Sequence, residues 1–550
     1  MLNKRIILFT ILLTGSLFAC KKKDSAPITP ANQNPVANAG ADITITLPVN
    51  TVTLNGSASS DPDGSINAYK WTYISGPTGN SITNETLATT SVNGLTVGVY
   101  IFELKVTDNK GASATDNVQV TVLTAADVDP PAYGTPYNNI SATEDMVMYE
   151  INERAFSASG NLQGIIDRLD SIKALGVNTI WLMPIHPIGI TKTVNSPYCV
   201  RNYKEVNTEF GTLDILRDLV SQAHQKNMAV IIDWVANHTA WDNPWINNKD
   251  WYTQDGSGNI VIPPGTNWSD VADLNYSNND MRLAMIKAMK YWVLTANIDG
   301  YRTDAADLVP YDFWKQAIDT LKNMPGRNLI LLAEGSRTDH FTAGFQLNYA
   351  WDFYTALKNV FKNNNAASSL FTANTNEYAS IPTGKKKLRF TTNHDESAWD
   401  ATPITLFNGK QGALAASVIT SYINGGPLIY SSQEVGRITT VPFFSNSPID
   451  WTQNSDMVTA YKNIFAFYNN SNALRRGSLT AYTDNDIVCF KKTYNTEEAV
   501  VLVNTRNSII NYTLPAALTN TNWNNAFDNT AVTLATSISI NPYGYIVLKK

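Results

Sequence analysis

The sequence predicts a multidomain chain in which a central (β/α)8 TIM barrel, with a short inserted subdomain, is flanked by two β-sandwiches. Three observations support this fold class. Eight apolar runs of strand length alternate with helical patterns across the middle of the chain. Short alternating runs separated by turn residues come before and after that region. With 550 residues, 43% of them hydrophobic, the chain is long enough for several separate cores.

Charge and cysteine content exclude several classes of function. The formal net charge of −6 is small for a chain of this length, so we expect no nucleic-acid partner. Three cysteines, at positions 20, 199 and 489, are too few and too widely spaced for a disulfide framework, a zinc site or a CxxC redox pair. The aromatic fraction of 10% argues against a disordered chain.

The first 20 residues resemble a bacterial lipoprotein signal peptide. Two basic residues precede an apolar run over 6–19, which ends directly before Cys20. That run of 14 residues is shorter than the roughly 20 needed to cross a bilayer. The resemblance implies lipidation of Cys20 and contact with a membrane through this anchor only. We expect a location in the bacterial cell envelope, with the outer membrane favoured because Lys21 follows the cysteine; an ordinary cleaved signal peptide is the alternative.

The N-terminal sandwich is predicted over residues 35–124, after a flexible polar linker at 21–34. Alternating stretches are separated by turn sequences, and no helical period appears. The segments LNGSASSDPDGSI, YKW and YIFELKVTDNKG occur in this order and resemble a PKD domain, which is an immunoglobulin-like module. We expect Trp71, which lies on one of these strands, to belong to the core; a platform for sugar binding is the alternative.

The central barrel is predicted over residues 140–475, after the boundary signal Asp129-Pro130-Pro131. Strands that alternate with helices over such a length favour a closed barrel. The expected strands are 147–151, 178–183, 228–233, 298–303, 328–333, 345–349, 388–392 and 427–430. Expected helices between them include 162–175, 213–226, 281–296 and 311–323.

Two further segments belong to this region. The expected insertion at 239–280 carries four tryptophans, and Trp234 lies just before it. We expect these rings to form a small core, with one or two facing solvent beside a sugar cleft. Short alternating runs over 477–550 predict a C-terminal β-domain.

Polar side chains follow four of the predicted barrel strands. Because active sites of such barrels lie at the C-terminal ends of the strands, these groups are candidates for catalysis. A capped strand end is the alternative for each one singly, but burying all four is unfavourable unless they face one another across a cleft. The four segments are DWVANH at 233–238, GYRTDAAD at 300–307, LLAEG at 331–335 and TTNHDE at 391–396.

The carboxyl groups at these strand ends suggest a retaining glycosidase. Arg302 and Asp304 are two residues apart, so they project to the same face of a strand. The guanidinium should hold Asp304 ionised with a lowered pKa, as a nucleophile needs. Glu334 follows an apolar strand and faces two aspartates, so desolvation and like charge should keep its carboxyl group protonated for acid catalysis. Retaining enzymes place such a pair about 5–5.5 Å apart.

The four segments resemble, in the same order, the sequence blocks of glycoside hydrolase family 13, the α-amylase family, over roughly 145–550. SPY at 196–198, VADLN at 271–275 and GGPLIYSSQE at 425–434 agree as well. The resemblance implies that Asp304 is the nucleophile, Glu334 the acid/base and Asp395 the stabiliser of the transition state. It also implies that the following residues surround the sugar at the cleavage point: Tyr198, His238, Arg302 and His394. From the residues alone, we expect both histidines to act as hydrogen-bond donors or acceptors for sugar hydroxyls at neutral pH.

The resemblance also implies a structural Ca²⁺. Asn237 and Asp273 occupy the positions of two oxygen ligands, which suits a hard cation; hydrogen bonds that cap loops are the alternative. One departure concerns the segment after the nucleophile, where many family members have Lys-His. This chain has Asp307-Leu308 there, so an acidic residue replaces the lysine.

The expected function is hydrolysis of α-1,4-linked glucans, such as starch or maltooligosaccharides, through a covalent glycosyl-enzyme. A glucanotransferase or isomerase of the same family would carry the same three carboxylates and is an alternative. A catalytically inert glycan-binding lipoprotein is a third hypothesis, against which the intact trio argues. The preferred glucan and linkage, endo or exo action and the oligomeric state stay open.

Overall fold

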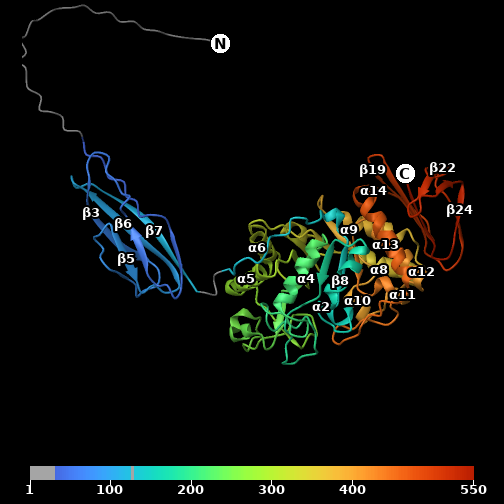
Figure 1. The fold of residues 1–550 in the computed structure, drawn as a ribbon, viewed down its shortest axis with the longest axis horizontal. Helices are drawn as coiled ribbons and strands as arrows, with labels where there is room; N and C mark the ends of the chain where they lie inside the picture. Colours follow the sequence, from blue (N-terminus) through green and yellow to red (C-terminus); the bar gives the residue numbers. More distant parts are fainter. Residues whose placement is uncertain (1–30, 125–128) are drawn as a thin grey trace, which may run out of the picture. The chain divides into compact units, whose positions relative to one another are not determined.

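The structure is a computed structural model that describes residues 31–124 and 129–550. The chain forms two compact units, divided between Val128 and Asp129 (Figure 1). The expected signal peptide, its Cys20 and most of the expected linker lie outside the described residues. In the described ranges, no helix has the length and apolar character that crossing a membrane requires.

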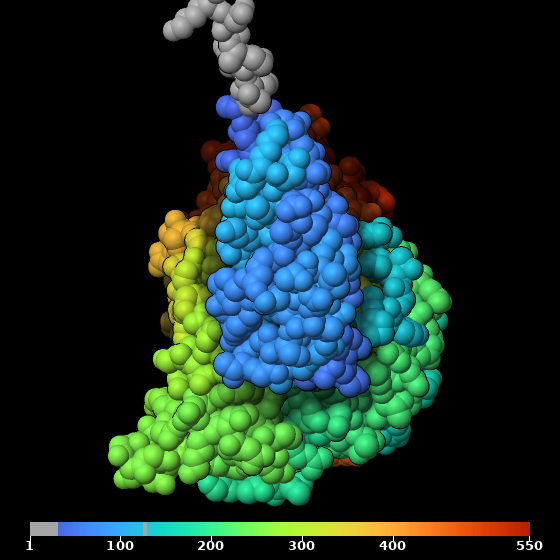
Figure 2. Space-filling view, turned by 90° about the vertical axis from the view of Figure 1, so that its left-hand side faces the viewer, coloured from blue at the N-terminus to red at the C-terminus, as the bar shows by residue number. Residues whose placement is uncertain are grey.

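The N-terminal unit is a β-sandwich, as predicted. Trp71 is wholly buried in its core, and its indole N–H donates to the carbonyl of Leu87 at 3.2 Å. The expectation that this ring belongs to the core is therefore confirmed. Figure 2 shows one face of this unit in blue. One sheet has the order β1 (Ile43–Thr46), β7 (Ser113–Leu123), β6 (Gly98–Asp108) and β3 (Ile66–Ser75). The other has the order β2 (Val52–Asn55), β5 (Thr89–Asn93) and β4 (Ser81–Ile82).

The second unit is built on a closed barrel of eight parallel strands, which confirms the predicted fold class. Each expected strand is present, and β17 closes the barrel by pairing with β8. In chain order the strands are β8 (Met148–Ile151), β9 (Thr179–Leu182), β10 (Ala229–Val235), β13 (Gly300–Asp304), β14 (Ile330–Ala333), β15 (Leu347–Tyr349), β16 (Lys386–Arg389) and β17 (Gly426–Tyr430).

The helices between these strands follow from capping and amphipathic patterns. In α4 (Leu213–Gln225), the Thr212 side chain accepts a hydrogen bond from the N–H of Ile215, while the apolar face packs inward. The expected helix at 162–175 is instead two helices, α2 (Leu162–Ile166) and α3 (Leu169–Ala174), which meet at Arg168. The remaining helices are α1 (Glu153–Phe156), α5 (Asn279–Thr295), α6 (Tyr311–Lys322), α7 (Asp339–Ala343), α8 (Trp351–Lys362), α9 (Ser369–Tyr378), α10 (His394–Trp399), α11 (Pro403–Leu406), α12 (Lys410–Tyr422), α13 (Ser455–Asn470) and α14 (Asn472–Arg476).

The seventh strand, β16, begins and ends earlier than expected. The prediction placed it at 388–392, whereas it spans Lys386–Arg389. Two of its charged side chains, Lys387 and Arg389, are buried because they have partners. Lys387 donates to the side-chain oxygen of Asn348 at 2.8 Å and to the carbonyl of Tyr349 at 2.7 Å. The segment after this strand is a loop that leads into α10, so that Asp395 lies in the first turn of a helix.

The segment at 239–280 contains little regular structure. β11 (His238–Ala240) pairs with β12 (Val271–Asp273) in an antiparallel ladder. Trp245 and Trp251 pack edge to face, with ring centroids 5.3 Å apart. Trp268, with 38% of its surface exposed, is the ring in this segment that faces solvent most.

The C-terminal residues form two sheets, as expected for a β-sandwich. Alternate side chains of the larger sheet face opposite ways. Val488 and Phe490 join the core around the barrel, whereas Cys489 lies in the separate core of the sandwich. The larger sheet has the order β18 (Ser478–Tyr482), β19 (Ile487–Tyr494), β20 (Glu497–Asn504), β25 (Tyr545–Lys549), β22 (Thr521–Asn525) and β23 (Ala531–Leu534); β21 (Ile510–Thr513) pairs with β24 (Ser537–Ile540).

Candidate active site

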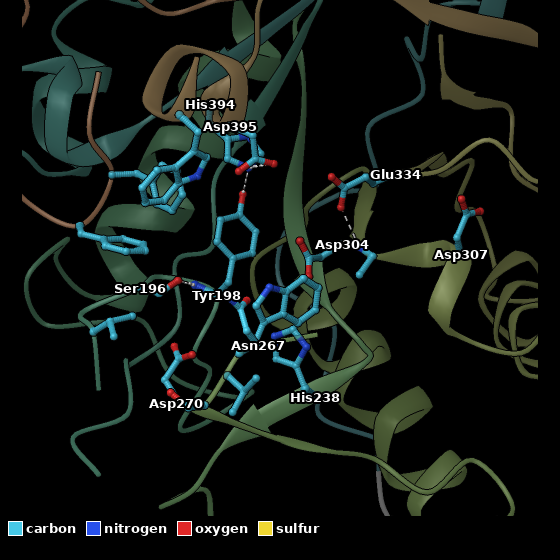
Figure 3. A pocket seen from close by; sticks show the side chains of 18 of the residues that line it. Ser196, Tyr198, His238, Asn267, Asp270, Asp304, Asp307, Glu334, His394 and Asp395 are labelled. Carbon is cyan, nitrogen blue, oxygen red and sulfur yellow. Dashed lines mark hydrogen bonds and ion pairs between the residues drawn. The ribbon is translucent and has the colours of Figure 1, made fainter. Parts of the chain in front are cut away.

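A cleft of about 750 Å³ lies at the C-terminal ends of the barrel strands. Asp304 lies between Tyr198 and Glu334 in this cleft, and the His394–Asp395 segment lies beside Tyr198 (Figure 3). The structure therefore brings together residues that are as far apart in the chain as Tyr198 and Asp395. The expected site residues that line the cleft are Tyr198, His238, Asp304, Glu334, His394 and Asp395.

Arg302 lies behind the carboxylates, wholly buried on β13. Its Nη1 donates to Asp233 at 2.8 Å and to Asp304 at 3.0 Å, and its Nη2 forms an ion pair with Glu334 at 2.9 Å. Arg302 does not line the cleft. The expectation that it surrounds the sugar is therefore corrected: it binds and orients the carboxylates from behind.

The electrostatics of Asp304 also differ from the expectation. Burial raises the pKa of Asp304 well above its ordinary value, and the negative charge of Glu334 raises it further, although Arg302 acts in the opposite direction. The expected lowering is wrong because one guanidinium is shared among three carboxyl groups, those of Asp233, Asp304 and Glu334. Three acids that face one cation favour retention of a proton within the cluster.

Glu334 is held by the backbone that follows Asp304. The N–H of Ala305 donates to its Oε2 at 2.7 Å, and the N–H of Ala306 donates to its carbonyl at 3.0 Å. Ala305 has the left-handed φ of 43°, which turns its N–H toward the acid. The carboxyl group of Glu334 therefore lies among polar partners, although the strand before it is apolar.

His394 belongs to a buried chain of hydrogen bonds. Its Nδ1 lies 2.5 Å from Oε1 of Glu150, and its Nε2 lies 2.7 Å from the hydroxyl of Tyr198. Burial alone would lower the pKa of His394, but the carboxylates of Asp395 and Glu150 together raise it to about 9. Sequence reasoning missed Glu150, whose only signal is a charged residue inside the apolar run 147–151.

His238 differs from His394 in its electrostatics. Burial lowers the pKa of His238 to about 4, so its ring is neutral at pH 7. Its ring contacts Trp268 edge to face, with centroids 5.5 Å apart, and both residues line the cleft. Tyr198 stacks on the ring of His394, with centroids 5.2 Å apart and ring planes 18° apart.

Asn237 and Asp273 lie at neighbouring positions, as the calcium expectation requires. His238 pairs with Asp273 across the β11–β12 ladder, and the N–H of Leu274 donates to the carbonyl of Asn237 at 3.2 Å. Both residues are buried, and both supply oxygen atoms, which suit Ca²⁺. Within 31–124 and 129–550, no group of three or more His, Cys, Asp and Glu side chains is arranged to hold a metal ion. Any calcium site here would therefore need amide or carbonyl oxygens besides Asp273.

Asp307 binds the loop that follows Glu334. Its carboxylate accepts the N–H groups of Ser336 at 3.0 Å and Arg337 at 3.2 Å. It also lines the cleft. The acidic residue that replaces the lysine of other family members thus fixes the backbone next to the expected acid.

Comparison with known proteins agrees with this geometry. The family model "Alpha amylase, catalytic domain" matches residues 107–490, and a family model of a PKD domain matches residues 39–122. Alpha-amylase 3 of Dictyoglomus thermophilum is 26% identical over 366 residues, which cover 58% of this chain and 69% of that protein. A cyclomaltodextrinase of Thermoanaerobacter pseudethanolicus is 24% identical over 378 residues, 63% of either chain. The chain thus spans about two thirds of the length of these relatives.

A solved structure shares the architecture. The maltogenic alpha-amylase AmyB from Thermotoga neapolitana matches with a TM-score of 0.68 and 25% identity, over 74% of this chain and 99% of that one. Because the family model covers more than half of the chain and the barrel carries the cleft described above, the chain belongs to the alpha-amylase family of glycoside hydrolases, with a PKD-like domain before its catalytic domain.

Proposed function

We propose that this chain is a retaining glycosidase that hydrolyses α-1,4-glucosidic bonds in starch-type glucans or maltooligosaccharides. One observation carries the proposal: Asp304 and Glu334 contact the two terminal nitrogens of one buried guanidinium, at the floor of an open cleft. Double displacement at a sugar carbon requires two carboxyl groups beside the cleaved bond, and the shared guanidinium brings such a pair together.

In the proposed reaction, a carboxylate oxygen of Asp304 attacks the anomeric carbon while Glu334 gives its proton to the glycosidic oxygen. The bond between the anomeric carbon and that oxygen breaks, and a glycosyl ester forms on Asp304. Glu334 then removes a proton from water, which displaces Asp304 and restores the α configuration. In this proposal Asp395, with 38% of its side chain exposed, binds hydroxyl groups of the distorted sugar.

The cleft has a direction that favours oligomeric substrates. The leaving group must lie on the side of Glu334, so the sugar that becomes covalently bound lies over Tyr198. Aromatic contacts continue from that side, because Phe443 contacts Tyr198 at 5.9 Å and Trp399 contacts Phe443 at 5.8 Å between ring centroids. Trp399 is 67% exposed and lines the cleft, so its face is available to a further glucose unit.

The decisive experiment measures reducing ends and product anomer on a panel of starch, pullulan, cyclodextrin, maltose, sucrose and trehalose. A retaining hydrolase releases many reducing ends from starch, and the first product seen by NMR is the α anomer. A glucanotransferase would release few reducing ends, and a binding protein none. A β anomer as first product would contradict the assignment of Asp304 as a nucleophile.

Asn237 and Asp273 would hold a structural Ca²⁺ in this proposal, with the ion stabilising the segment at 239–280. A ligand that binds the native state only raises the melting temperature. We therefore expect EDTA to lower the Tm and added Ca²⁺ to restore it, with a smaller response in Asp273→Ala. Identical Tm values with EDTA and with Ca²⁺ would contradict the site.

The cell-envelope location is also part of the proposal, and it depends on Cys20. Wild type should fractionate with membranes and incorporate a labelled fatty acid, whereas Cys20→Ala should do neither. A Cys20→Ala protein that stays membrane-bound and labelled would contradict lipidation at this residue.

A further inference from the structure

Glu150 begins a row of hydrogen-bonded groups that crosses the floor of the cleft. Its Oε1 lies 2.5 Å from Nδ1 of His394, whose Nε2 lies 2.7 Å from the hydroxyl of Tyr198. That hydroxyl lies 3.0 Å from Oδ2 of Asp233, and Asp233 accepts Arg302 at 2.8 Å. The carboxylate of Glu150, the imidazole and the guanidinium are all almost wholly buried. Water therefore replaces none of these partners easily.

The hydrogen bonds along this row indicate which ring nitrogens of His394 carry protons. When Glu150 is ionised, Nδ1 must carry the proton of their contact. If Nε2 carried none, it would need the single hydroxyl proton of Tyr198, and the contact between Tyr198 and Asp233 would have no donor. If Nε2 is also protonated, it donates to Tyr198, and Tyr198 donates to Asp233. With Glu150 and Asp233 both ionised, only the doubly protonated ring gives every contact in the row a donor.

The charged groups around His394 support this arrangement. Glu150 reaches it from β8, and Asp395, on its own helix, places Oδ2 3.4 Å from Nε2. The positive charge of Arg302 on β13 disfavours a protonated His394, but Arg302 is already shared among three carboxylates. Burial raises the pKa of Glu150, and His394 acts against that rise. Asp233 on β10 also interacts electrostatically with His394. The ring of His394 contacts the uncharged rings of Trp181, Tyr198 and Phe443.

We propose that Glu150 is a positioning residue that holds His394 as an imidazolium ion, so that the cleft presents a cationic donor between Tyr198 and Asp395. The charge would orient Tyr198 under the sugar and place a cation beside the carboxylate of Asp395. Its role in catalysis rests on the proposed function, whereas the charge state of His394 does not.

The Glu150→Gln variant removes the negative charge of this side chain and keeps its shape. The glutamine carbonyl can still accept the Nδ1 proton, so the ring keeps its orientation, but the negative charge is gone. Glu153→Gln is the matched control, because Glu153 is also buried close to the end of β8. No hydrogen bond or ion pair joins Glu153 to His394 in the described part of the chain.

The first measurement is a pH titration of the histidine rings by NMR, which needs no substrate. The chain has five histidines, and the signal of His394 is the one missing from His394→Gln. In wild type this ring should be an imidazolium at pH 7 and titrate near 9. In Glu150→Gln it should titrate at about 8 or below, and in Glu153→Gln as in wild type. A neutral His394 in wild type at pH 7, or the same titration in Glu150→Gln, would overturn the proposal.

The second measurement is the ratio of wild-type to Glu150→Gln kcat/KM as a function of pH. Below about pH 5.5 the ring is protonated in both proteins, so the ratio of wild-type to Glu150→Gln kcat/KM should be close to 1. At pH 8 we expect a ratio of roughly tenfold or more, the worth of a charged rather than a neutral hydrogen-bond donor. A ratio that does not change with pH would indicate a purely structural Glu150 and contradict the role in catalysis. Absence of glycosidase activity in wild type, with the NMR result intact, would contradict the proposed function instead.

Discussion

Two arginines on barrel strands are equally buried but have opposite charge balance. Arg389 on β16 pairs with one carboxylate, that of Glu377, while its other nitrogens donate to Asn424 at 2.8 Å and Asn374 at 2.9 Å. Arg302 on β13 faces three carboxylates. At Arg389 each charge has its own partner, which stabilises the fold. At Arg302 the acids are in excess, and this excess leaves a carboxyl group that can hold and release a proton.

The comparison predicts opposite results when an acid is removed. Without Glu377, Arg389 would be a buried charge without a counterion, which is strongly unfavourable. Without the charge of Asp304, Arg302 would still have two carboxylates, and repulsion among the acids would fall. Stability and activity should therefore respond in different ways at the two arginines.

The largest expected effect on activity is that of Asp304→Asn. The amide cannot form the glycosyl ester, so kcat on maltooligosaccharides should fall on the order of 10⁴-fold or more. The Tm at pH 7 should stay the same or rise, because a like charge is removed. Calorimetry and steady-state kinetics on the same preparation test both parts. A marked fall in Tm would show that the acids at Arg302 are balanced, as at Arg389.

Glu334→Ala should fail in a different manner. Activity on starch should fall ~10²–10⁴-fold, since the leaving group loses its proton donor. An α-glucosyl fluoride needs no such donor, so the glycosyl-enzyme should still form. Added azide should then displace Asp304 and yield the α-glucosyl azide. In Asp304→Ala, azide should attack the fluoride directly and give the β anomer; reversed anomers would exchange the two roles.

Glu377→Ala tests the balanced arginine. The free energy of unfolding should fall by about 3–5 kcal/mol, because Arg389 is left buried without its carboxylate. The kcat of the folded fraction should be unchanged, since neither residue lines the cleft. Asn374→Ala is the control: it removes a neutral partner of the same guanidinium and should cost about 1.5–3 kcal/mol. Chemical denaturation gives both values, and equal losses would argue against a special role of the charge.

The pH dependence of stability should differ between wild type and Asp304→Asn. The pKa of Asp304 is raised in the folded protein above its ordinary 3.8, so this group stabilises the fold most below about pH 4. That contribution is lost as the pH rises through the folded-state pKa. The Tm of Asp304→Asn relative to wild type should therefore increase from pH 4 to pH 8. A constant difference would indicate that Asp304 is ionised with an ordinary pKa.

The smallest expected effect is that of Trp399→Ala, which lies outside the charge cluster. Loss of an exposed stacking surface should raise KM for long maltooligosaccharides by about 2- to 12-fold, equivalent to about 0.5–1.5 kcal/mol. The kcat should stay close to wild type, and KM for maltose should change less. A large fall in kcat would mean that Trp399 supports the carboxylates, which no contact described above suggests.

The sequence was sufficient for the barrel, because its strands are apolar runs bounded by helices. It was insufficient for the position of β16, where Lys387 and Arg389 lie on the strand itself. A hydrophobicity pattern does not detect such a strand, because its buried charges are paired with groups elsewhere in the chain. Residues 390–392, apolar or neutral, looked more strand-like but form the loop that leads to His394.

The polar strand ends located the cleft correctly, but not its protonation states. The contact between Arg302 and Asp304 could be predicted from their spacing in the sequence. The ion pairs of Asp233 and Glu334 with the same guanidinium form only because the barrel closes. The charge of His394 depends on Glu150, which lies 244 residues away along the chain. The direction of a pKa shift in such a cluster depends on how many groups share one charge. The number of sharing groups cannot be read from spacing along the chain.

The left-handed turn at Ala305 has a consequence for how this site can change. Because a backbone N–H at that turn holds Glu334, the gap between the carboxyl groups of Asp304 and Glu334 is set by the main chain as well as by the shared side chain of Arg302. A larger gap, as an inverting enzyme needs to admit water, would require β13 or β14 to be rebuilt at its end. Exchanging side chains should therefore alter which glucan is cleaved, or how fast, long before it alters the stereochemical outcome.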